Sequence, residues 1–206
     1  MTLEDKLFES LNAPLNSANM RRAFLLLMRV HFSSPSNYGQ LAEQLGGLIY
    51  TGETGSPMDV ELMSVFNAKQ VNPRPGVFVG LRGIKFTKQT IDNFAGSSED
   101  GSKKFFEMKA ETRLLVRHVA QISDMSSVMA DTTTACLFGM REILMKHLGF
   151  TLFDILGQSE PTQTEQAPER AFQTDVECNV AFQYALTTNI ESHRIKKVVD
   201  QFTHNQ

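Results

Sequence analysis

One run near the end of the sequence restricts the possible folds more than any other feature. From Phe172 to Thr187, apolar or nearly apolar residues alternate with mostly polar ones. Successive side chains of a β-strand point to opposite faces, so this alternation predicts a strand with one buried face. Such a strand would span roughly 50 Å, whereas most strands have roughly 3–10 residues. We therefore expect it to bend, to carry a bulge, or to extend beyond its own domain.

A second alternating run comes earlier in the chain. Within residues 104–120, the even positions from Met108 to His118 share one face, and mostly charged residues share the other. Residues 76–86 are rich in strand formers, and the intervening residues 87–103 are polar. The two runs predict an extended β-hairpin with a long tip.

Three segments have the apolar spacing of amphipathic helices, namely residues 3–12, 17–32 and 123–148. Residues 150–156 predict a short strand. Residues 37–71 are ambiguous, since their pattern fits both short helices and a strand, and the glycines within them argue against one continuous element.

Residues that favour helix ends flank two of these helices. Ser17 is the expected N-cap of the second helix, and Ser123 or Asp124 of the third. Gly149 follows the third helix, where a left-handed residue often ends the helix.

Together these elements predict an α+β fold. N-terminal helices precede a mixed or antiparallel sheet with an extended hairpin, and a central helix packs on that sheet. The 206 residues suit a single domain spanning 1–206, with a helical part at 1–70 and a sheet-and-helix core at 71–206.

The composition excludes several classes of protein. The net charge is −3, which argues against a dedicated nucleic-acid binder, and the sequence has no long uncharged apolar run that would predict a membrane span. The N-terminus lacks the apolar core of a signal peptide. We expect a protein made in a reducing cytoplasm, without membrane association.

No motif predicts catalysis, a metal or a cofactor. Cys136 and Cys178 lie on apolar stripes, which favours two free core thiols over a disulfide. The histidines lack metal-binding spacing, and His118 and His147 lie near element ends, where solvated histidines are common. Asp131 is expected on the polar face of its helix.

Charged residues on the predicted strands are the candidate interface. Lys109, Arg113 and Arg117 share a strand face with two glutamates, and this mixture of signs favours cross-strand or intersubunit salt bridges over a phosphate track. The acidic hairpin tip and the basic tail could meet between subunits. The interface candidates are Glu99, Asp100, Arg113, Arg117, Asp175, Glu177, His193 and Arg194.

The order of elements resembles the tail-terminator and neck proteins of tailed bacteriophages. The resemblance covers roughly residues 70–200 and rests on four features. These are the Arg74–Val79 segment that opens the hairpin, the polar tip that runs to Gly101, the helix from Ser123 to Leu148, and the strand at Thr174–Thr188 that precedes Glu191–Ile195.

The resemblance implies a structural virion protein and no enzyme. Such a protein is expected to form a ring of six copies, with twelve copies as the alternative, between the head connector and the tail proteins. DNA passes through the lumen without sequence-specific binding. Assembly takes place in the host cytoplasm. Two alternatives are another phage tube or baseplate adaptor, and an enzyme whose site is scattered over the loops.

Overall fold

The structure is a computed structural model that describes residues 2–12, 16–63, 75–88, 94–99, 103–164 and 171–189. Within these ranges it contains four α-helices, one 3-10 helix and eight strands. The helices are α1 (Leu3–Leu11), α2 (Ser17–His31), η1 (Pro35–Leu41), α3 (Ala42–Leu45) and α4 (Ser123–Leu148). The strands are β1 (Asp59–Leu62), β2 (Gly76–Leu81), β3 (Lys85–Lys88), β4 (Phe94–Ser97), β5 (Lys103–Ala120), β6 (Phe150–Gln158), β7 (Thr162–Gln163) and β8 (Phe172–Asn189).

The described strands form one mixed sheet, which confirms the expected α+β class. Its central order is β1-β2-β5-β8-β6, with β3 and β4 pairing with β5 and β7 pairing with β8. Strand β1 runs parallel to β2, whereas β2 is antiparallel to β5 and β6 to β8. The ambiguous segment before residue 70 therefore contributes short helices and also an edge strand.

The chain divides into two compact units. The first comprises residues 1–84 and 111–182, and the second comprises residues 85–110 and 183–206. Strands β5 and β8 each contribute residues to both units.

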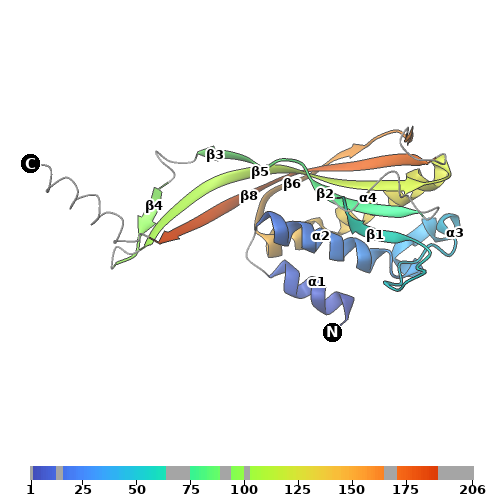
Figure 1. The fold of residues 1–206 in the computed structure, drawn as a ribbon, viewed down its shortest axis with the longest axis horizontal. Coiled ribbons are helices and arrows are strands. Elements are labelled where there is room, and N and C mark those ends of the chain that lie inside the picture. The colour runs from blue at the N-terminus through green and yellow to red at the C-terminus, as the bar shows by residue number, and fades with distance from the viewer. Residues whose placement is uncertain are drawn as a thin grey trace, which may run out of the picture. The chain divides into compact units, whose positions relative to one another are not determined.

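In the first unit, α1 and α2 lie on the same side of the sheet (Figure 1). Helix α2 packs on β1 and β2, and α4 packs on β6. Phe24 of α2 stacks on Phe150 and Phe153 of β6, with ring centroids 6.2 and 6.0 Å apart. These rings form a continuous apolar core between the helices and the sheet.

The long strands confirm the expected alternation. On β5, Ala110, Thr112, Leu114, Val116 and His118 are all buried on the helix-covered face. On β8, the buried positions on the same face are Thr174, Val176, Cys178, Val180 and Phe182. The register between β6 and β8 shifts twice, between Phe150 and Leu152 and between Ile155 and Gly157. We expected the last strand to bend, to be bulged or to extend beyond its own domain. The register shifts show irregularities in the pairing of β8 with β6, and β8 also continues from the first unit into the second.

The N-caps of α2 and α4 differ from those that the sequence predicted. Asn16, one residue before Ser17, is the N-cap of α2, and its Oδ1 accepts from the amides of Ala18 and Asn19. At α4 the N-cap is Ile122, which has no capping side chain, so neither Ser123 nor Asp124 fills that role. A β-branched residue was not expected there, because Ser and Asp supply the oxygen that helix amides need. The left-handed backbone of Gly149 is confirmed.

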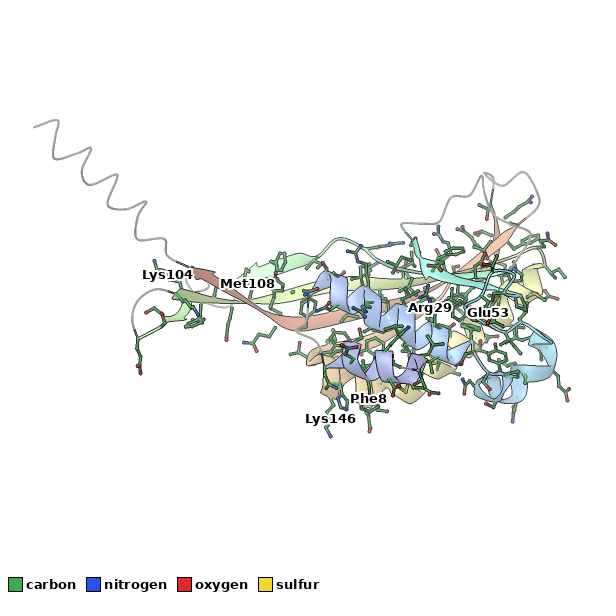
Figure 2. All side chains as sticks on the ribbon, turned by 60° about the horizontal axis from the view of Figure 1, so that its bottom comes forward. Phe8, Arg29, Glu53, Lys104, Met108 and Lys146 are labelled. Carbon is green, nitrogen blue, oxygen red and sulfur yellow. The ribbon has the colours of Figure 1, made fainter. Side chains whose placement is uncertain are left out.

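In the second unit, the short strands β3 and β4 pair with β5, and β4 does so near the start of that strand. Strand β4 is antiparallel to β5, and the amide of Lys103 donates to Ser98 Oγ at 2.9 Å. Phe86 contacts Tyr184 edge-on at 5.3 Å, and Gln183 donates to Glu107 at 2.6 Å. Figure 2 shows Lys104 on β5 within this unit.

Candidate functional site: a salt-bridge ladder, a buried histidine network and a cavity

Arg117 of β5 and Asp175 of β8 form a bidentate ion pair. Nε and Nη2 of the arginine each donate to one carboxylate oxygen at 2.9 Å. Both side chains are largely buried, at 22% and 15% exposed. The hydrogen bonds to Asp175 raise the pKa of Arg117, although burial acts in the opposite direction. Two parallel bonds fix the relative orientation of the two strands more strictly than one point contact could.

Glu177 is the second carboxylate of a salt-bridge ladder on the sheet. The ladder consists of Arg82, Arg113, Arg117, Asp175 and Glu177. It accepts from Arg82 at 2.8 Å and lies 3.5 Å from Arg113, which belongs to β5. Sequence reasoning missed Arg82. Its backbone amide donates to the carbonyl of Arg113 at 2.8 Å, which places both arginines beside Glu177. Only the pairing of the segment after β2 with β5 could have revealed this neighbour.

The structure thus brings four of the eight interface candidates together and gives each a partner within the chain. These four are Arg113, Arg117, Asp175 and Glu177. Of the two alternatives that the sequence left open, Arg113 and Arg117 form cross-strand salt bridges within the chain. Glu99 is exposed in the turn after β4, whereas Asp100, His193 and Arg194 lie outside the described residues. A role of these residues between subunits stays a prediction.

His118 does not lie in solvent as we expected from its position near the end of its strand. It is fully buried, with Nδ1 3.1 Å from the carbonyl of Thr174 and Nε2 2.8 Å from Thr133 Oγ1. A carbonyl only accepts, so Nδ1 carries the proton and Nε2 accepts from the threonine hydroxyl. Burial lowers the pKa of His118 to about 4. The imidazole is therefore neutral at pH 7.

The hydrogen bonds of His118 continue into a buried network. Thr174 Oγ1 lies 3.0 Å from Ser126 Oγ, and Ser126 donates to the carbonyl of Ser123 at 2.8 Å. The network joins the helix-covered face of β5 and β8 to α4. A fully paired polar network of this kind specifies one packing arrangement of the three elements.

A cavity of about 500 Å³ opens between α1, α2, η1 and α4. Leu7, Leu27, His31 and Tyr38 on its lining are buried. The other lining residues are Val30, Asn37, Gly39, Ala135, Cys136, Gly139 and Met140.

Three titratable groups line this cavity, and burial keeps all of them neutral. It lowers the pKa of His31 to about 4 and raises the pKa of the Tyr38 phenol and of the Cys136 thiol to about 12. Neither cysteine forms a disulfide, which confirms the expectation of free thiols.

The remaining candidate residues do not form a metal site within the described ranges. These ranges contain no group of three or more His, Cys, Asp or Glu residues that could hold a metal ion. Asp131 is exposed on α4, as expected, and accepts from Gln158 at 2.7 Å. His147 is half-buried against Phe8, with ring centroids 6.2 Å apart; Figure 2 shows Phe8 and the adjacent Lys146.

Comparison with known proteins assigns no family. No protein-family model matches the sequence, and no curated protein matches it. Among the described helices, none combines the length and the apolar character needed to cross a membrane.

Proposed function

We propose that this chain is a structural subunit of a ring at the neck or top of a bacteriophage tail, where it joins the head connector to the tail. The observation that carries the proposal is the length of β5 and β8. Each has 18 residues and contributes to two compact units. Strands of this length exceed what one small core needs, and extended sheet elements are suited to contacts with neighbouring copies.

The second unit supports an assembly role through its exposed aromatic rings. Phe86 of β3 is 48% exposed, and Phe105 of β5 is 38% exposed. Exposed aromatic side chains are typical anchors of protein interfaces, where burial by a partner supplies most of the binding energy. We infer that neighbouring subunits cover them in the ring.

The salt-bridge ladder supports a structural role for the sheet. Arg82, Arg113 and Arg117 all pair with the carboxylates of Asp175 and Glu177, so none of the three guanidinium groups is left without a carboxylate partner that competes with DNA phosphates. The same pairs lock β5 to β8. A sheet of this kind suits a ring through which DNA passes without sequence-specific binding.

Particle mass over a concentration series tests the proposal. We expect the purified protein to form a closed species whose mass is a multiple of 23.1 kDa, with a central hole in negative-stain images. We expect Phe105→Ser to weaken ring formation about tenfold or more, because it removes an interface anchor. The matched variant Phe105→Leu keeps an apolar side chain and should assemble much as the wild type does.

One result would overturn the proposal, namely a monomer at every concentration that also fails to close when purified head-connector or tail-tube protein is added. A ring that forms equally well with Phe105→Ser would instead overturn the inference that neighbouring subunits cover the aromatic rings of the second unit.

A further inference from the structure

The cavity in the helical layer has the dimensions and chemistry of a small-molecule site. Its volume of about 500 Å³ lies within the roughly 300–1,000 Å³ typical of ligand pockets. Leu7, Leu27 and Tyr38 form buried lining, whereas Gly39 and Gly139 are exposed. A Cβ built on either glycine would meet nothing within 4 Å. Both lining positions therefore have room for a larger side chain.

The lining selects against charged ligands. It contains no Asp, Glu, Lys or Arg, and its histidine and cysteine are held neutral by burial. An ion entering this cavity would lose its hydration without gaining an opposite charge. An uncharged, mainly apolar molecule would instead gain from leaving water.

His31 supplies one unused polar group on this lining. The residue is 6% exposed, and its buried Nε2 has no hydrogen-bond partner in the part of the chain that the structure describes. Its nearest ring neighbours, Phe32 and Tyr38, meet the imidazole edge-on at 4.8 and 5.8 Å. Buried polar groups are nearly always hydrogen-bonded, so the unpaired Nε2 of this lining residue is the atom that the polar group of a ligand would satisfy.

We propose that this cavity binds an uncharged, mainly apolar small molecule that carries one hydroxyl and hydrogen-bonds to the imidazole of His31. The site is separate from the salt-bridge ladder and does not depend on ring formation. Cys136 and Met140 of α4 contribute polarisable sulfur atoms to the same lining, which suits an aromatic ligand.

Phenol and toluene are matched probes, since they have nearly the same size and phenol carries a hydroxyl where toluene has a methyl group. We expect both to bind the full-length protein saturably in NMR titrations, with shifts concentrated at residues 30–39 and 135–140. In His31→Leu, phenol should lose about fivefold in affinity relative to toluene, the value of one net hydrogen bond.

A second pair of variants keeps the test decisive if His31→Leu does not fold. Gly139→Leu places a side chain in the open space and should weaken both probes at least tenfold. Gly139→Ala adds only a Cβ where nothing lies within 4 Å and should bind both probes as the wild type does. The absence of saturable binding to the wild type would overturn the proposal, as would binding that Gly139→Leu leaves unchanged.

Discussion

Arg117 and Asp175 lie 58 residues apart in sequence and meet through two hydrogen bonds of 2.9 Å. Asp175→Ala would leave the guanidinium of Arg117 largely buried without its partner. We expect the free energy of unfolding to fall by about 1–3 kcal/mol, because a buried donor that loses its acceptor keeps its desolvation penalty. Urea denaturation measures this loss.

Glu177→Gln is the control for that experiment. Its arginine partners are more than half exposed, so the change should cost under about 1 kcal/mol. Equal losses in the two variants would contradict the ranking of the two pairs.

Adjacent threonines on α4 give a matched test of the buried network. Thr133→Val removes the hydroxyl that donates to His118 and should destabilise the protein by about 1–3 kcal/mol. Thr134 Oγ1 is buried without a partner in the described structure, so Thr134→Val should be neutral or stabilising. Thermal unfolding of both variants tests the difference, and a larger loss for Thr134→Val would refute the network.

Stability should fall in mild acid because His31 and His118 are buried in the neutral form. Burial lowers each folded-state pKa from 6.5 to about 4. As the pH drops below 6.5, the unfolded chain takes up protons that the folded protein does not bind until about pH 4. Stability is therefore fully present above pH 6.5 and is lost between pH 6.5 and 4.

The size of this effect can be measured by urea denaturation at pH 7.5 and 5.0. We expect each histidine to account for about 2 kcal/mol of the loss between these two values. His31→Leu should show a smaller loss than the wild type by that amount. An identical pH dependence in the two proteins would show that His31 is not held neutral.

A capping side chain at the N-terminus of α4 should stabilise the protein. Ile122 occupies the N-cap position with extended backbone and is 59% exposed, so Ile122→Asp can supply the missing acceptor without losing core packing. We expect a gain of about 0.5–2 kcal/mol. Asn16→Ala removes the cap of α2 and should cost a similar amount. Calorimetry of the two variants would contradict this if their melting temperatures moved in the same direction.

Local patterns predicted the elements well, because each depends on residues near one another in sequence. The alternation around Val176 and Cys178 marked β8, and the spacing of Met20, Phe24 and Leu27 marked α2. The cap of α2 was missed by one residue, since Asn16 and Ser17 are both good capping residues.

The candidate sites depended on information that local patterns lack. His118 occupies one of the alternating positions of β5 that point to the core, so its burial follows from the strand pattern. Its partners Thr133 and Thr174 come from other elements, which the pattern does not reveal. Arg82 joins the ladder only through the alignment of its segment with β5. The cavity depends on how α1, α2, η1 and α4 pack together, and no residue spacing encodes an empty volume.

The position of β8 has a consequence for synthesis of the protein on the ribosome. Although it is the last described strand along the chain, it lies in the interior of the sheet, between β5 and β6. Until residues 172–189 have emerged, those two strands each present a row of unpaired backbone groups and lack the side chains of Val176, Val180 and Phe182. Open edges of this kind attract other chains. A nascent or truncated chain that ends before β8 is therefore the form most exposed to aggregation and to capture by chaperones.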